Sequence, residues 1–154
     1  MSYICNVFNF VIITTMKIIQ NISAKLINAG IKPSYQRIKI FEYVFNNNIH
    51  PTVDNIYKKL SKEIPTLSKT TVYNTLKLFE EQKLIKSVTI DENEIRYDAR
   101  KEIHGHFKCE SCGKIFDFNY NYNDLEFSGL DDFVLNQTDV MIKGICKKCR
   151  IKNS

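Results

Sequence analysis

Two closely spaced pairs of cysteines constrain this 154-residue chain more than any other feature. Cys109 and Cys112 form one Cys-x-x-Cys pair, and Cys146 and Cys149 form the other. Such a turn directs two thiolates at one tetrahedral ion, and two turns complete a shell of four sulfurs. Because a closed shell leaves no position for a substrate, the spacing predicts a structural zinc site. The alternatives are unrelated buried cysteines or a redox pair, and the unpaired Cys5 supports no inference.

The composition is that of a globular protein with a mild basic excess. Apolar residues make up 44% of the chain and charged residues 25%, which is too apolar for a disordered chain. The 22 Lys and Arg residues against 17 Asp and Glu give a net charge of +5. This charge favours a polyanionic partner, although a solvated lysine-rich surface would have the same composition.

The N-terminal stretch has the features of neither a membrane span nor a signal peptide. No apolar run is long enough to cross a bilayer, and the apolar segment Phe8 to Ile13 is short and has no basic residue before it. Met16 stands where an amphipathic helix begins. We therefore expect residues 1–16 to be an N-terminal extension, with Met16 as an alternative start. We also expect a cytoplasmic protein, in which cysteines bind metals more often than they form disulfides.

Four amphipathic helices are predicted after this extension. Residues 17–29 repeat apolar side chains at helical spacing and end at Gly30, which can adopt a positive φ. Ser34, Thr52 and Ser68 can each cap a further helix, the last over about residues 69–82. The apolar positions of the first helix are Ile18, Ile19, Ile22, Leu26 and Ile27. The last three helices and the hairpin are predicted to share one core, with Ile38, Phe41, Val44 and Phe45 in the second helix, Val53, Ile56, Tyr57 and Leu60 in the third, and Val72, Leu76 and Phe79 in the fourth.

A two-stranded hairpin follows the fourth helix, with strand-like residues at 84–90 and 95–97 on either side of a polar turn. Helices followed directly by such a hairpin are the pattern of a winged-helix domain, which we assign to residues 17–98. A charged stretch at residues 99–103 is the predicted hinge.

The second domain, residues 104–154, is predicted to be a small α+β unit. Its expected strands lie at residues 106–109, 114–118 and 140–145, with a helix at 124–135. A unit of this size has little core of its own, so a metal would stabilise it substantially. The predicted fold class is therefore α+β, a winged-helix domain followed by a zinc-stapled α/β domain.

The three histidines form a second candidate metal site. His104 and His106 are alternate residues of one extended segment, so both imidazoles can reach one ion. His50 lies in the loop before the third helix and, taken alone, is equally well a capping or surface residue. Asp98 ends the hairpin and Asp117 follows the first cysteine pair. Spacing alone does not distinguish these two carboxylates from the other acidic residues of the chain.

Three segments carry a resemblance to a known family. They read HPTVDNIY at residues 50–57, SKTTVYNTL at residues 68–76 and HGHFKCESCGK at residues 104–114. From about residue 17 to residue 149 the chain resembles the ferric uptake regulator (Fur) family of bacterial repressors. The resemblance implies a homodimer, held together by residues 104–154, that binds palindromic double-stranded DNA when a divalent regulatory metal is present.

Within this family the chain is most similar to the peroxide-responsive (PerR) branch. That branch uses three histidines and two aspartates as its regulatory metal site, and the matching residues are His50, Asp98, His104, His106 and Asp117. The iron-responsive branch typically has Glu where Asp98 stands. Three imidazoles with two carboxylates suit Fe(II) or Mn(II), and five protein ligands leave an octahedral ion one open position.

The PerR resemblance also implies how the signal is sensed. Peroxide reacts with bound iron, and the residues that match the oxidised ligands are His50 and His104. Manganese at the same site would make the protein insensitive to peroxide. The further His-rich site of many relatives would need a histidine near Gln137 or Thr138, and none is present, so we expect no such site.

The fourth predicted helix is expected to enter the major groove of DNA. Residues on this helix and on the hairpin could contact bases or phosphates, although a solvated helix face would look similar at each single position. The candidate DNA-binding residues are Lys69, Thr70, Thr71, Tyr73, Asn74, Lys77 and Lys86.

The predicted function is a metal-dependent repressor, not an enzyme. An iron- or zinc-uptake regulator of the same family is the first alternative, because metal preference depends on residues around the ligands. A zinc-ribbon metalloenzyme would need a substrate pocket and a general base, and the sequence offers no separate candidate for either. A zinc-ribbon protein–protein adaptor would leave the winged helix without a role.

Overall fold

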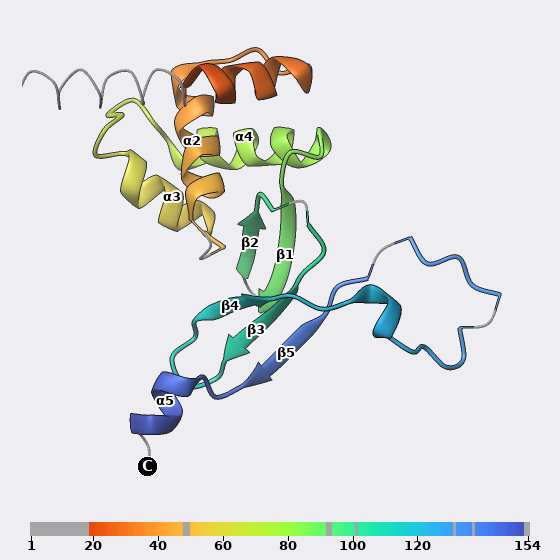
Figure 1. The fold of residues 1–154 in the computed structure, drawn as a ribbon. Helices are drawn as coiled ribbons and strands as arrows, with labels where there is room; N and C mark the ends of the chain where they lie inside the picture. Colours follow the sequence, from red (N-terminus) through yellow and green to blue (C-terminus); the bar gives the residue numbers. More distant parts are fainter. Residues whose placement is uncertain are drawn as a thin grey trace, which may run out of the picture.

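The computed structural model describes residues 19–47, 50–91, 94–100, 102–130, 132–136 and 138–152. The helices of the first half of the chain gather at one end of the molecule, a small sheet with a short C-terminal helix lies at the other, and a two-stranded hairpin lies between them (Figure 1). This arrangement confirms the α+β fold class. The predicted extension at residues 1–16 lies outside the described residues, and the exact domain and hinge boundaries stay predictions.

The helical end contains a helix over residues 19–28, followed by α2 (Tyr35–Asn46), α3 (Val53–Leu60) and α4 (Lys69–Glu81). The three predicted caps are confirmed. Ser34 Oγ accepts the N–H of Arg37 at 3.3 Å, and Ser68 Oγ accepts that of Thr71 at 3.0 Å. Thr52 forms a reciprocal capping box with the third residue of α3.

The core of this domain lies where the helices meet. Leu26, Ile56, Leu76 and Phe79 are completely buried there, as the helical periodicity predicts. The prediction for Phe45 is wrong, because this side chain is 49% exposed, and Ile27 of the first helix is 61% exposed. The Phe45 ring stacks at the rim on Phe41, with centroids 6.0 Å apart, and Lys25 covers it at 4.4 Å. Ile40 is fully buried instead.

The hairpin consists of β1 (Lys86–Asp91) and β2 (Glu94–Asp98), which pair antiparallel with Lys86 opposite Asp98. Tyr97 is buried against the helical core, and its N–H donates to the carbonyl of Pro51 at 3.1 Å. The hairpin is therefore fastened to the loop that precedes α3. This contact brings the end of β2 next to His50.

The second sheet has the order β4-β3-β5, formed by β3 (Gly105–Cys109), β4 (Ile115–Phe118) and β5 (Met141–Gly144). β3 pairs antiparallel with β4, so that His106 lies opposite Asp117, and parallel with β5. The three predicted strands are confirmed. A short helix that the sequence analysis missed, α5 (Lys147–Lys152), follows β5.

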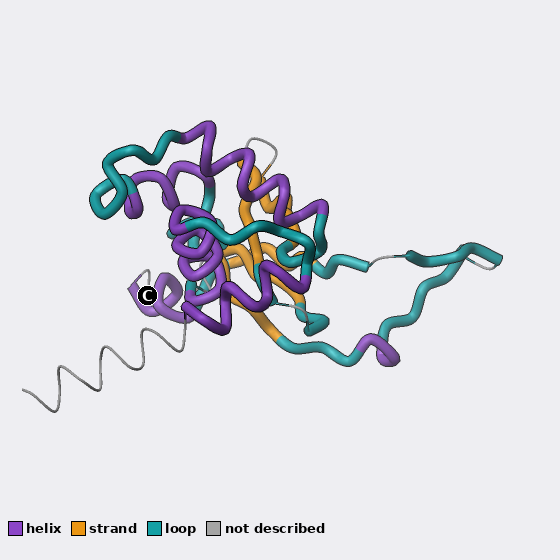
Figure 2. The backbone as a smooth tube through the Cα atoms, turned by 90° about the horizontal axis from the view of Figure 1, so that it is seen from above, coloured by secondary structure: helices purple, strands orange, loops and turns teal. Residues whose placement is uncertain are grey.

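The helix predicted at residues 124–135 is wrong. A single 3-10 turn, η1 (Tyr122–Asp124), precedes an irregular loop that projects from the body of the molecule (Figure 2). Amphipathic helices owe most of their stability to packing of the apolar face. Here Phe133 and Val134 remain 67% and 84% exposed, so that packing is missing. Gly129, with φ +80°, further interrupts the segment.

Candidate metal centres

The five residues of the predicted regulatory site meet at the junction of the hairpin and the second sheet. Asp98 Oδ2 lies 3.0 Å from His104 Nε2, 3.8 Å from His50 Nε2 and 3.9 Å from His106 Nε2. Asp117 Oδ1 lies 3.3 Å from His50 Nε2. His50, His104, His106 and Asp117 thus place one donor atom each within 4.8 Å of one another. Asp98 Oδ2 lies beside the three imidazoles, and the five residues come from three separate parts of the chain. The cluster is buried, with the histidines at most 4% exposed.

The unpartnered atoms of this cluster fit a divalent cation. Asp98 Oδ2, Asp117 Oδ1 and His104 Nε2 are buried with no hydrogen-bond partner among the described residues, and each such atom costs about 1–3 kcal/mol. His50 Nε2 and His106 Nε2 face each other at 3.1 Å. Two neutral imidazoles in this arrangement can form one N–H···N hydrogen bond, with a single proton between the two nitrogens. A cation would accept all five lone pairs at once.

The protonation states of the cluster also suit a cation. Burial alone would raise the pKa of Asp98, but interactions with His106, the Arg100 N–H and the other two imidazoles lower it to about 2. Burial lowers the pKa of His50, which outweighs the two nearby carboxylates. At neutral pH the aspartate is therefore ionised and the imidazole neutral, the forms in which both bind metals.

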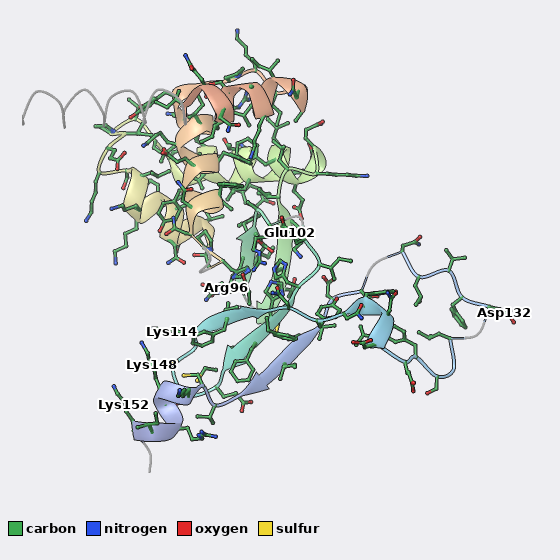
Figure 3. The ribbon with its side chains drawn as sticks, in the orientation of Figure 1. Arg96, Glu102, Lys114, Asp132, Lys148 and Lys152 are labelled. Carbon is green, nitrogen blue, oxygen red and sulfur yellow. The ribbon has the colours of Figure 1, made fainter. Side chains whose placement is uncertain are left out.

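Residues around the cluster orient its donors, and the sequence analysis missed all of them. His104 Nδ1 donates to the carbonyl of Glu102 at 2.7 Å, which leaves the lone pair on Nε2 for the cluster. Arg96 Nη1 donates to the carbonyl of His50 at 3.2 Å. Arg96 lies on the hairpin and Glu102 beside it (Figure 3). No sequence motif could identify them, because each contact involves a backbone carbonyl.

The four cysteines of the two Cys-x-x-Cys pairs also converge, with all sulfurs within 4.8 Å of one another. Cys112 Sγ and Cys146 Sγ are 3.9 Å apart, close to the edge of about 3.8 Å that a tetrahedron with Zn–S bonds of about 2.3 Å requires. The N–H of Cys146 donates to Cys109 Sγ at 3.3 Å and lowers the pKa of that thiol to about 6. The Cys109 thiolate is therefore available at neutral pH.

Local backbone structure positions both cysteine pairs. The N–H of Gly113 donates to the carbonyl of Cys109 at 2.8 Å, and Gly113 has φ +68°, which glycine adopts without strain. Cys146 directly precedes α5, whose first turn carries Cys149. These two tight turns are what the Cys-x-x-Cys spacing predicts. The donor set of four soft sulfurs fits zinc.

The predicted DNA-binding residues lie in two places. On α4, Thr71 is half-buried and five residues are exposed: Lys69, Thr70, Tyr73, Asn74 and Lys77. Lys86 lies elsewhere, at the start of β1, where its Nζ is 3.6 Å from Asp98 Oδ2. The α4 set thus forms one exposed face, whereas Lys86 contacts the histidine cluster.

Two further predictions concern what this chain lacks. The absence of an additional His-rich site stays a prediction, because Gln137 lies outside the described residues. Within the part of the chain that the structure describes, no helix is both long and apolar enough to cross a membrane.

Comparisons with known proteins give a consistent result. The model of the ferric uptake regulator family matches residues 28–126. The peroxide-responsive repressor PerR of Staphylococcus aureus is 37% identical over 132 residues, which cover 84% of this chain and 89% of that protein.

Solved structures share the fold. The ferric uptake regulator from Francisella tularensis with iron has a TM-score of 0.67 at 27% identity, covering 79% of this chain and 96% of that one. The Vibrio cholerae ferric uptake regulator has a TM-score of 0.67 at 22% identity, covering 80% of this chain and 98% of that one. These matches extend over both the helical end and the second sheet.

Proposed function

Because the chain belongs to the ferric uptake regulator family, we propose that it is a metal-dependent, DNA-binding transcriptional repressor that responds to peroxide. The observation that carries the proposal is the buried cluster of His50, His104, His106 and Asp117, whose donor atoms lie within 4.8 Å of one another, with Asp98 Oδ2 beside the three imidazoles. Three of its donor atoms, on Asp98, Asp117 and His104, are buried without a hydrogen-bond partner among the described residues. The similarity to the S. aureus peroxide-responsive repressor supports the peroxide signal.

Two ions would have separate roles. The regulatory ion, Fe(II) or Mn(II), would be held by His50, Asp98, His104, His106 and Asp117, a set of nitrogen and oxygen donors that suits these metals. Zinc would be held by Cys109, Cys112, Cys146 and Cys149, where four sulfurs leave no reactive position. The first ion is the sensor and the second stabilises the small second domain.

The regulatory ion would couple the sensor to DNA binding. His50 belongs to the winged-helix domain and Asp98 to the end of its hairpin, whereas His104, His106 and Asp117 belong to the second domain. An ion shared by these residues fixes the orientation of the two domains. A switch needs two states. Here they would be a fixed orientation of the two domains with the ion bound and a variable orientation without it.

A homodimer would present two α4 helices to a palindromic operator. The second domain carries exposed apolar side chains that suit a contact with a second copy of this chain, because monomeric proteins rarely expose many such residues together. They include Phe116, Phe127, Phe133, Val134, Ile142 and Ile145. The exposed residues of α4 would contact bases and phosphates.

Peroxide would act on the imidazoles of the sensor. Bound Fe(II) would supply the electron transfer that cleaves the O–O bond of hydrogen peroxide. One oxygen of peroxide would be inserted into a ring C–H bond of His50 or His104 to give C–OH, and the other oxygen would leave as water. The oxidised imidazole is a poorer donor and differently shaped, so the domains lose their fixed orientation and DNA is released.

Peptide mass spectrometry tests this proposal. Fe(II)-loaded protein treated with a small dose of peroxide should release operator DNA and gain one oxygen on the peptide that contains His50 or His104. Mn(II)-loaded protein, the matched control, should do neither. The cysteines should stay unmodified at that dose, because zinc-bound thiolates in a closed shell are poorly accessible.

Two other outcomes would contradict it. Oxidation of Cys109 and Cys112, with both histidines intact, would replace the mechanism with thiol oxidation and zinc loss. Retention of DNA without any modification would assign the protein to iron- or zinc-dependent regulation instead.

A further inference from the structure

Arg100 contacts both carboxylates of the histidine cluster. Its backbone N–H donates to Asp98 Oδ1 at 2.8 Å, and its side-chain Nη1 donates to Asp117 Oδ2 at 2.8 Å. Asp98 ends the hairpin and Asp117 lies in β4, so this one residue joins acidic ligands from both sides of the hinge. The Arg100 side chain is 34% exposed and that of Asp117 is 9% exposed, so the ion pair lies at the edge of the buried cluster.

Each carboxylate therefore has one oxygen hydrogen-bonded by Arg100 and a second oxygen that faces the histidines, with the Lys86 ammonium 3.6 Å from that oxygen of Asp98. The oxygens that Arg100 does not contact, Asp98 Oδ2 and Asp117 Oδ1, are the two that lie without a hydrogen-bond partner among the histidines. A carboxylate can bind an ion through one oxygen or through both. A charge-assisted hydrogen bond to one oxygen disfavours the second mode, and the guanidinium keeps its charge at any physiological pH.

We propose that Arg100 is a positioning residue that restricts Asp98 and Asp117 to one metal-binding oxygen each and so keeps one position of the regulatory ion open. The inference rests on the proposed regulatory metal site. Three imidazole nitrogens and two carboxylate oxygens make five donors. A six-coordinate ion then has one position for water, and this is the position that peroxide needs. If Asp117 were to bind through both oxygens, it would fill that position.

The two contacts can be separated by mutation. Arg100→Leu removes the guanidinium and frees Asp117, but it keeps the backbone N–H that engages Asp98. The substitution also removes a positive charge beside a cation site. We therefore expect Mn(II) affinity to hold or rise in this variant, whereas a loosened fold would lower it. Arg100→Lys retains a charged donor for Asp117 Oδ2 and should behave like the wild type.

The experiment measures the water bound to Mn(II). Full-length zinc-containing protein is loaded with Mn(II), and the longitudinal relaxation rate of water protons reports exchangeable water on the ion. We expect a bound-water contribution in the wild type, its loss in Arg100→Leu and its return in Arg100→Lys. The Fe(II)-loaded Arg100→Leu variant should also react with peroxide about 10- to 100-fold more slowly, the usual effect of residues that orient metal ligands. Arg37→Leu is the control, because Arg37 Nη1 makes a comparable hydrogen bond, 2.7 Å to the carbonyl of Lys32, in the helical domain.

Each outcome decides between the hypotheses. Unchanged bound water in Arg100→Leu at retained affinity overturns the inference, as does a wild-type Mn(II) ion without bound water. Loss of Mn(II) binding in Arg100→Leu that Arg100→Lys does not restore shows a purely structural role and also overturns it. If the wild type binds no Mn(II) through its histidines, the proposed regulatory site itself fails.

Discussion

Replacement of Asp98 by asparagine is the sharpest test of the regulatory site. Asparagine has the same shape and retains an oxygen that can accept the Arg100 N–H at 2.8 Å. It lacks the negative charge, which the low pKa of about 2 keeps on Asp98 at neutral pH. With that oxygen engaged, the amide NH2 takes the place of Oδ2 and offers no lone pair to a metal. The substitution therefore removes the charge and one donor atom while the side chain keeps its shape.

The size of the effect follows from the distances in the cluster. Asp98 Oδ2 lies between 3.0 and 3.9 Å from the Nε2 atoms of the three histidines, so an ion bound by these nitrogens lies within about 4 Å of the carboxylate. At this distance two unit charges attract by about 4 kcal/mol at an effective dielectric constant of 20. A divalent ion doubles the attraction, and desolvation of the carboxylate offsets part of it. We take the smaller value, which corresponds to about a thousandfold weaker binding of Mn(II).

The assay combines three measurements on the same protein. Electron paramagnetic resonance of free Mn(II) gives the affinity, fluorescence anisotropy with a palindromic operator gives DNA binding, and metal analysis gives the zinc content. Asp98→Asn should lose metal-dependent DNA binding at Mn(II) concentrations that saturate the wild type, with zinc retained. Glu126→Gln, at an exposed position of the second domain, is the charge-matched control. Wild-type Mn(II) affinity in Asp98→Asn would refute the assignment of Asp98 as a ligand.

Three further predictions concern zinc, DNA and the N-terminus. Cys109→Ser or Cys146→Ser should lose zinc and give monomers or aggregates in size-exclusion chromatography with light scattering, because the second domain has little core without the metal. A stable DNA-binding dimer of either variant would contradict the structural-zinc assignment. Binding to operator DNA should require Mn(II) or Fe(II), and the affinity should fall as the salt concentration rises, since DNA binding releases counterions. Equal affinity for the operator in a chelator and in Mn(II) would rule out the switch. A chain that starts at Met16 should dimerise and bind DNA as the full chain does, and a large loss of affinity in gel-shift titrations would show that residues 1–15 take part.

Local features of the fold could be predicted from the sequence because they depend on nearby residues. The caps Ser34, Thr52 and Ser68 each bond an N–H three residues ahead, so the residue type and its distance from the first apolar position suffice. The strands of the second sheet follow from their alternation and from the cysteine turns. The five cluster residues were identified through the resemblance, since spacing alone singled out only His104 and His106.

Features that depend on distant packing could not be predicted in this way. Apolar periodicity at residues 124–135 indicates a helix only if a surface covers its apolar face, and among the described residues of this segment Phe133 and Val134 stay 67% and 84% exposed. Lys86 stays a predicted phosphate contact. Its contact with the regulatory cluster could not be predicted, because antiparallel pairing places it opposite Asp98, with its ammonium group 3.6 Å from that carboxylate. Arg100 has no motif at all. Its contacts with Asp98 and Asp117 arise because the hinge passes between these two carboxylates in the folded chain.

The connections of His50 indicate which part of the molecule a lost ligand would release. His50 has φ +50°, a left-handed conformation that costs a non-glycine residue about 1–2 kcal/mol. Arg96 Nη1 donates to the carbonyl of His50, and the N–H of Tyr97 donates to the carbonyl of Pro51. The hairpin therefore fixes this loop without any ion. A bound ion would therefore add only the attachment of the second domain, through His104, His106 and Asp117. To change a 1:99 population into 99:1 takes about 5.5 kcal/mol, and a single charged ligand contributes about 4 kcal/mol. Loss of one carboxylate donor would thus remove much of the free energy that such a switch needs and would free the second domain to rotate, while the loop at His50 would keep its structure.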